Sequence, residues 1–198
     1  MNGFEKRAQQ IKDRILSTTQ ELLRTTPPRK LRIADIAKAA EVSQVTIYNY
    51  FGSKEELIRE VFRSFFDQVM NDYEAFMGEG HTVKEQIEYI LQLEKTVYHA
   101  NFPPGLVKEL LAEDQELYSY MEEQYRERAV PLTVRMIQAG KDSGEISEAV
   151  TIEHILTLMQ LYMNQYEFIL SAAQRSEDLD RFLEGMVHMF FYGICGKP

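Results

Sequence analysis

The sequence predicts an all-α protein, with a short N-terminal helical unit followed by a longer helical body. Apolar residues recur at three- and four-residue steps along most of the chain, and no stretch of any length alternates as a strand would. Residues 33–56 contain a compact pattern of helix, turn, helix and helix start. Charge is also divided: residues 1–54 carry 10 Lys and Arg against 5 Asp and Glu, and the remainder carries 12 against 26. These three observations separate a basic first unit from an acidic body.

The first helix is predicted over residues 4–23, with one apolar stripe and a basic opposite face. It ends before Thr26-Pro27-Pro28, because a proline disfavours helical geometry in the residue before it. A basic link, residues 29–32, then leads into the second helix. Most basic side chains of this unit are expected to be solvated, and the candidate phosphate contacts among them are Lys6, Arg29 and Arg32.

The second and third helices are predicted on either side of a tight turn near Ala40-Glu41-Val42. Ser43 can cap the third helix through its hydroxyl. The pattern directs Val45, Ile47 and Phe51 toward an interior and leaves polar and aromatic groups on the other surface. A helix, a turn and a short polar second helix form the helix-turn-helix arrangement, whose second helix fits the major groove of DNA.

The third helix carries side chains that suit DNA recognition. The amide of Gln44 can form a bidentate contact with adenine, and Thr46 and Val45 can touch a thymine methyl group. Tyr48 and Tyr50 are expected to contact phosphate or sugar through their hydroxyls, unless they pack mainly against the first helix. A basic unit on an acidic body is expected where only that unit meets phosphate, although chance clustering of basic residues is the alternative.

The run SQVTIYNYFGSKEEL, residues 43–57, resembles the signature of the tetracycline-repressor (TetR) family of bacterial transcriptional regulators. Its dense pattern, T-I-Y-x-Y-F-x-S-K-E-x-L, is far more specific than a generic helix-turn-helix. Two positions depart from the family: Arg32 replaces a small hydroxyl cap, and Glu41 puts a non-glycine in a position that can be left-handed. The motif and its neighbours give the candidate DNA-binding residues Arg32, Ser43, Gln44, Val45, Thr46, Tyr48, Asn49, Tyr50 and Lys54.

The body begins with a fourth helix, predicted from Ser53 to about residue 76 and started by a capping box of Ser53 with Glu56. Lys54 adds positive charge to this helix N-terminus, which is a natural site for a phosphate. Pro131 removes one backbone hydrogen bond and should kink the 114–140 helix or divide it near Ala129. The remaining helices are predicted at about residues 82–98 (with a capping box of Thr82 and Glu85), 106–112, 114–140, 151–174 and 178–195.

The last two predicted helices are apolar over most of their circumference, so each must be covered on more than one side. A four-helix interface with a second copy of the chain is the economical cover, and the TetR resemblance implies the same; the alternative is a well-buried monomer core. The resemblance also implies a small effector bound in the body. Tyrosine and methionine there favour a hydrophobic or aromatic effector, with plain core packing as the alternative. The candidate effector-binding residues are Phe62, Tyr89, Tyr98, Phe102, Leu106, Met121, Tyr125, Met159, Tyr162, Met163 and Tyr166.

Other function classes find little support in the sequence. The single cysteine, Cys195, permits no intrachain disulfide, and no Cys/His set has zinc spacing. No Ser/His/Asp pattern, P-loop or dinucleotide-binding glycine motif occurs, so no catalytic residue, metal site or cofactor is predicted. No apolar run approaches the ~20 residues that cross a bilayer. The N-terminus lacks the apolar core of a secretory signal, so a cytoplasmic location is expected.

The resulting hypothesis is a DNA-binding transcriptional regulator, most simply a dimeric repressor that an effector releases from its operator. Residues 1–52 would form the DNA-binding domain and residues 53–198 the effector-binding and dimerisation domain. The expected partners are double-stranded operator DNA, a small-molecule effector and a second copy of the chain, with no membrane. The alternative keeps the DNA-binding unit but makes the body a protein-interaction platform without an effector. Activation in place of repression stays open.

Overall fold

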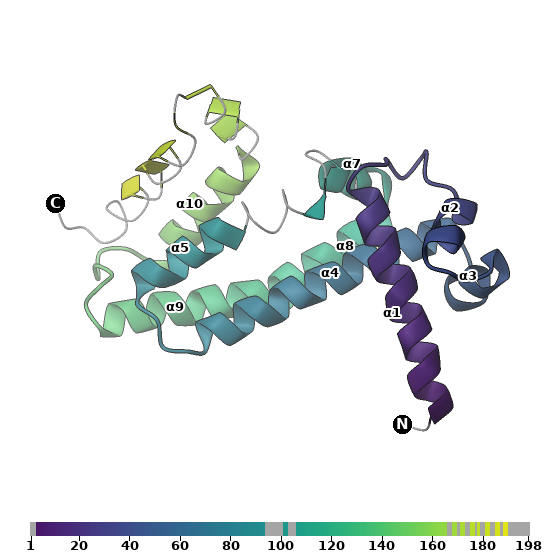
Figure 1. The fold of residues 1–198 in the computed structure, drawn as a ribbon. Coiled ribbons are helices and arrows are strands. Elements are labelled where there is room, and N and C mark those ends of the chain that lie inside the picture. Colours follow the sequence, from purple (N-terminus) through teal and green to yellow (C-terminus); the bar gives the residue numbers. More distant parts are fainter. Residues whose placement is uncertain are drawn as a thin grey trace. The chain divides into compact units, whose positions relative to one another are not determined.

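The computed structural model describes residues 3–93, 101–102 and 106–165, and positions 168–169, 171–172, 175–176, 178, 181–182, 185–186 and 188–189. Across these residues the chain forms helices joined by turns, without a strand (Figure 1). The predicted all-α fold class is therefore confirmed. The chain divides into two compact units: Met1–Asp72 with Leu93–Tyr125, and Tyr73–Gln92 with Arg126–Pro198.

The first unit begins with three helices around a shared apolar core. They are α1 (Gly3–Leu23), α2 (Ile33–Ala39) and α3 (Gln44–Phe51). Each contributes a fully buried isoleucine, namely Ile15, Ile36 and Ile47. The first helix ends ahead of Thr26-Pro27-Pro28, as predicted.

Helix α4 (Lys54–Met77) packs against the same core. Its buried face includes Leu57, Ile58, Val61, Phe62, Phe65 and Phe66. Half of the predicted capping box forms, because the Glu56 N–H donates to Ser53 Oγ at 3.0 Å. The other half of the prediction, a bond from the Ser53 N–H to the Glu56 carboxylate, is wrong. The Ser53 N–H donates to the Phe51 carbonyl at 2.9 Å, and the Glu56 carboxylate accepts from Arg59 and Arg63. Charged partners on the same helix face therefore displace the backbone bond.

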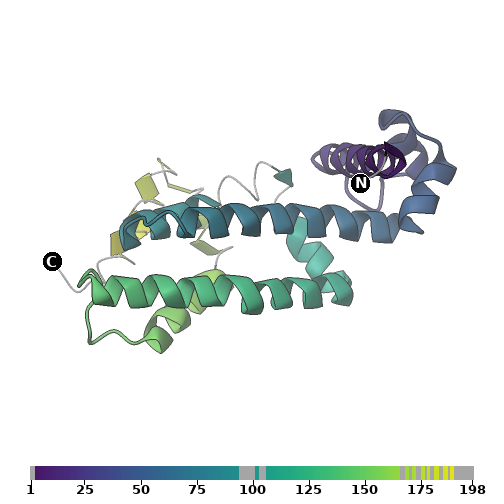
Figure 2. The same cartoon turned by 90° about the horizontal axis from the view of Figure 1, so that it is seen from below.

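The described part of the first unit also contains α7 (Leu106–Glu113) and α8 (Gln115–Gln124). Helix α8 lies alongside α4 (Figure 2), and the Tyr120 hydroxyl donates to Asp67 of α4 at 2.6 Å. Asp114 caps the N-terminus of α8 and also accepts from Arg59 Nε at 2.6 Å. The first turn of α8 is thus tied to α4 by charge.

Pro131 interrupts the helix predicted over residues 114–140. A π-helical turn, Tyr125–Ala129, separates α8 from α9 (Val130–Asp142), and Pro131 lies in the first turn of α9. Proline has no N–H to donate, and its ring crowds the carbonyl group four residues earlier, so the backbone widens there. The predicted division near Ala129 is confirmed.

The second unit has its own core among α5 (Val83–Leu93), α9 and α10 (Ile152–Asn164). Its buried residues include Val83, Ile87, Met136, Ile137, Ile146 and Ile155. The capping box of Thr82 and Glu85 forms in both directions, at 2.8 and 3.3 Å, as predicted. A Cβ at Gly140 would lie 2.6 Å from Val83 Cγ2, so this close approach of α9 requires glycine.

Most of the helix predicted over residues 151–174 is described, whereas most of the one predicted over residues 178–195 lies outside the described residues. Helix α10 begins one residue after the predicted start, and Ile155 on it is buried, whereas Leu161 is 56% exposed. The large apolar side chains of Phe168 and Met189 are also exposed. The dimer interface and the domain boundary between residues 52 and 53 stay predictions. Within the described part of the chain, no helix is both long and apolar enough to span a membrane.

Candidate nucleic-acid interface

The turn between α2 and α3 depends on a residue with unusual backbone geometry. Glu41 has φ of +54°, in the left-handed region that side chains rarely adopt. The Val42 N–H closes the turn by donating to the Ala37 carbonyl at 3.0 Å. The sequence departure at Glu41 therefore falls on the left-handed position, and the chain tolerates a modest strain there.

Helix α3 is held by two buried side chains and one cap. Ile47 and Phe51 are buried, and Ser43 Oγ accepts the Thr46 N–H at 3.0 Å, as predicted. The predicted interior position of Val45 is wrong, because 66% of its surface is exposed. Residues two apart on a helix lie on nearly opposite sides, so Val45 cannot share a buried face with Ile47, whereas Phe51 can.

The outer surface of α3 exposes most of the predicted DNA-binding set. Ser43, Gln44, Val45, Tyr48, Asn49 and Tyr50 are exposed, while Thr46 is half-buried. Tyr48 is 48% exposed and lies outside the buried core, which disfavours the alternative that it mainly packs against α1. These side chains are therefore accessible to a ligand that approaches α3.

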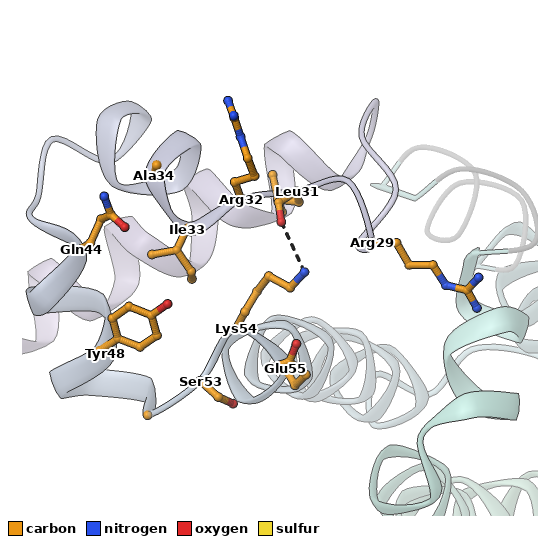
Figure 3. A pocket seen from close by; sticks show the side chains of 11 residues that line it. Arg29, Leu31, Arg32, Ile33, Ala34, Gln44, Tyr48, Ser53, Lys54 and Glu55 are labelled. Atoms are coloured by element: carbon orange, nitrogen blue, oxygen red, sulfur yellow. Dashed lines mark hydrogen bonds between the residues drawn. The ribbon is translucent and has the colours of Figure 1, made fainter.

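An open groove of about 520 Å³ lies beside this surface (Figure 3). It brings together four of the predicted residues, Arg32, Gln44, Tyr48 and Lys54, from three different elements. The other five, Ser43, Val45, Thr46, Asn49 and Tyr50, do not line it. The groove is also lined by Arg29, Leu31, Ile33, Ala34, Gly52, Ser53 and Glu55.

The cationic side chains of the groove have partners within the protein. Arg32 donates to both carboxylate oxygens of Asp35, at 2.8 and 2.9 Å, and this hydrogen bonding lowers the pKa of Asp35. Lys54 Nζ donates to the carbonyl oxygens of Pro28 and Leu31 at 3.2 and 3.4 Å. Arg32 itself stays largely exposed, with 76% of its side chain accessible.

Arg29 has acidic partners that sequence reasoning missed. Its guanidinium forms an ion pair with Glu113 and lies 3.6 Å from Glu109, both on α7. In Figure 3 the side chain of Arg29 extends away from Gln44 and Tyr48. The pairing joins residues 84 positions apart, so no local sequence signal predicts it.

The predicted effector-binding residues fall into three groups. Phe62, Phe102, Leu106 and Met121 meet in the first unit's core, where the Phe62 and Phe102 rings stack at 4.4 Å. Tyr125 is exposed, and Tyr89 stacks on Phe76 in the second unit at 3.9 Å. The remaining positions are outside the described residues (Tyr98 and Tyr166) or have side chains outside them (Met159, Tyr162 and Met163). Of the histidines and acidic groups that the structure describes, no set of three or more could hold a metal ion.

Residues 15–61 match the family model described as bacterial regulatory proteins, tetR family. This segment contains α2, α3, the turn between them and all of the residues that line the groove. This N-terminal segment is similar to that of the bacterial regulatory proteins of the tetR family. The resemblance predicted from residues 43–57 is therefore confirmed.

Two HTH-type transcriptional regulators are similar over different lengths of the chain. The HTH-type transcriptional repressor KstR2 of Rhodococcus jostii is 24% identical over 131 residues, which cover 63% of this chain and 62% of KstR2. The match therefore spans less than two thirds of that protein. The HTH-type transcriptional regulator EthR of Mycobacterium tuberculosis is 25% identical over 195 residues, covering 92% of this chain and 86% of EthR.

The fold is shared with a solved transcriptional regulator. The crystal structure of FadR from Bacillus subtilis, in complex with stearoyl-CoA, superposes with a TM-score of 0.69 at 20% identity. The match covers 91% of this chain and 98% of FadR. This likeness shows the fold, and the family model matches the segment that contains the helix-turn-helix at the N-terminal end of the chain.

Proposed function

We propose that this regulator is a dimeric repressor that binds operator DNA through α3 and leaves it when a small, hydrophobic or aromatic effector binds. The observation that carries the proposal is the outer surface of α3, where polar and aromatic side chains are exposed beside a groove with three cationic residues, Arg29, Arg32 and Lys54. Such a surface fits a major groove and its flanking phosphates.

Residues at the start of α3 would recognise the DNA bases. Gln44 would pair with adenine, while Val45 and Thr46 would contact thymine methyl groups. The rim of the helix would contact the DNA backbone through Ser43, Tyr48, Asn49 and Tyr50, with Arg32 and Lys54 supplying positive charge at this face.

The body would supply the effector site and the dimer contact. The stacked phenylalanines of the first unit give an apolar, aromatic environment, and FadR of the same fold was solved with stearoyl-CoA. In a dimer, two α3 helices must lie about 34–36 Å apart to enter successive major grooves. An effector that favours another spacing must weaken DNA binding by linkage.

Fluorescence anisotropy with the upstream intergenic DNA of its own gene, at several salt concentrations, tests the proposal. We expect tight, sequence-selective binding with a steep salt slope, because several phosphates are neutralised. Gln44→Ala should reduce the preference for operator over random DNA by about five- to hundredfold, since one good base contact discriminates by about 1–3 kcal/mol. Tyr48→Phe, the matched control, should weaken both complexes equally. No binding at low salt would refute the proposal.

The effector is tested with stearoyl-CoA as the first probe. We expect this probe to release the operator complex, and to leave the complex with random DNA and the folding of Tyr48→Phe unchanged. That result would support the repressor mechanism. A chain that binds DNA tightly but responds to no acyl or aromatic probe would favour the alternative, in which the body is a protein-interaction platform.

A further inference from the structure

Lys54 directs its ammonium group at the backbone between α1 and α2. Its Nζ donates to the carbonyl oxygen of Pro28 at 3.2 Å and to that of Leu31 at 3.4 Å. Figure 3 shows the side chain extending from the start of α4 toward Leu31. An ammonium has three donors, so two of them are directed at the protein itself.

The segment that Lys54 reaches is a turn with few other donors. Pro27 and Pro28 carry no backbone N–H. The N–H groups of Lys30 and Leu31 both donate to the Pro27 carbonyl, at 2.9 and 3.2 Å. A charged donor makes stronger hydrogen bonds than a neutral one, so the ammonium links both ends of this turn to the N-terminus of α4.

Two arginines leave the turn in different directions. Arg29 pairs with Glu113 of α7, whereas Arg32 follows Leu31 directly and is clamped by Asp35 at the N-terminus of α2. Both arginines line the groove beside α3. The position of the Leu31 carbonyl group therefore determines where the Arg32 side chain begins relative to α3.

We propose that Lys54 is a positioning residue: it fixes the turn of residues 27–31 so that Arg32 meets DNA phosphate beside α3. Lys54 itself does not contact phosphate. This inference rests on the proposed DNA-binding function and differs from the direct contact that a lysine at a helix N-terminus suggests. In this proposal the Lys54 ammonium binds backbone carbonyl oxygens, and the Arg32 guanidinium binds the DNA phosphate.

Amide hydrogen exchange of the free, full-length chain gives the first test. Lys54→Met keeps the side-chain length but has no donor, so the Lys30 and Leu31 amides should exchange about tenfold faster as the turn opens more often. Lys54→Arg keeps charged donors and should restore slow exchange. Lys30→Met removes an exposed lysine from the same turn and should leave the exchange of the Leu31 amide unchanged.

DNA affinity in two backgrounds gives the second test. Lys54→Met should weaken binding about five- to tenfold in the wild-type chain but much less in an Arg32→Met chain, because both changes remove the same arginine contact. Lys54→Arg should bind as the wild type does. Lys30→Met should weaken DNA binding by the same factor in the wild-type chain and in the Arg32→Met chain.

Unchanged amide exchange in Lys54→Met would overturn the proposal. The proposal would also be overturned if Lys54→Met weakened DNA binding equally in the wild-type and Arg32→Met chains and lowered the salt slope of binding by about one. That result is the signature of a lost phosphate contact. If the wild-type chain bound no DNA at low salt, the proposed function would fail. The exchange measurement needs no DNA and would still decide whether Lys54 holds the turn.

Discussion

At the scale of single residues, a cationic side chain beside α3 can bind either an acidic group of the protein or a phosphate of the expected DNA ligand. Arg29 lines the groove, yet its guanidinium pairs with Glu113 of α7. Because 71% of the Arg29 side chain is exposed, this pair is well solvated. Exposed ion pairs of this kind contribute only about 0.2–1 kcal/mol, so a DNA phosphate can compete for Arg29.

Glu113→Gln should therefore strengthen DNA binding by up to about fivefold, because it removes a competitor for Arg29. The salt slope should steepen by up to about one, since an additional phosphate is neutralised. Titration of a duplex at several salt concentrations measures both quantities. Glu123→Gln on α8 changes the net charge equally and serves as the control. Equal gains in the two variants would indicate a general charge effect and contradict the specific competition.

At the scale of helices, two carboxylates at the N-terminus of α8, Asp114 and Glu116, form ion pairs with arginines of α4, and Asp114 also caps α8. Asp114 accepts the N–H groups of Glu116 and Leu117 at 3.1 and 3.0 Å, and its other oxygen accepts from Arg59 at 2.6 Å. Burial raises the pKa of Asp114, but the hydrogen bonds from Arg59 and the backbone outweigh it, so the pKa lies below its ordinary value. The ionised form of Asp114 is therefore the stabilising one.

Asp114→Asn keeps a capping side chain but removes its charge. The lowered folded-state pKa means that Asp114 stabilises the fold above about pH 4, and that this contribution is lost as pH falls through the folded pKa. The free energy of unfolding at pH 7 should drop by about 1–3 kcal/mol. In urea unfolding between about pH 3 and 7, the free energy of unfolding should fall less on acidification in Asp114→Asn than in the wild type. An unchanged pH profile, matching that of Glu123→Gln, would contradict this role of Asp114.

Local chemistry explains which elements could be predicted from sequence. The cap at Ser43 and the break before Pro131 act within four residues, so short patterns suffice. Ion pairs such as Arg29 with Glu113 depend on chain packing over 84 positions and leave no local signal. Val45 and Ile47 are two positions apart on a helix, so when Ile47 is buried Val45 faces solvent.

The effector prediction shows a different limit of sequence reasoning. Helical spacing correctly marks Phe62 as inward-facing, and Phe62 meets Phe102 and Leu106 in one core. A pocket wall and a packed core use the same apolar residues at the same spacing, so periodicity does not distinguish them. Lys54 is a similar case, because its type and position fit a phosphate contact while its bonds go to the backbone.

At the scale of the whole molecule, the proposed function needs two copies with a fixed separation of their α3 helices. Large apolar side chains exposed on one copy are the natural contact between them. Leu161, Phe168 and Met189 are 56%, 66% and 60% exposed in the described part of the second unit. Burying such surface gains about 25 cal/mol per Å², which favours association through this part of the chain.

Leu161→Glu should convert the proposed dimer to a monomer at micromolar concentration, because a buried unpaired carboxylate opposes association. Operator affinity should then fall at least about tenfold, since a monomer reaches only one half-site and loses the gain from the second. Sedimentation equilibrium and anisotropy measure the two effects. Tyr118→Glu is the control, because Tyr118 is also a large exposed residue but lies on α8 in the first unit. A Leu161→Glu chain that remained dimeric and bound operator as the wild type does would exclude this surface from the dimer contact, and the α3 spacing would have to be set elsewhere.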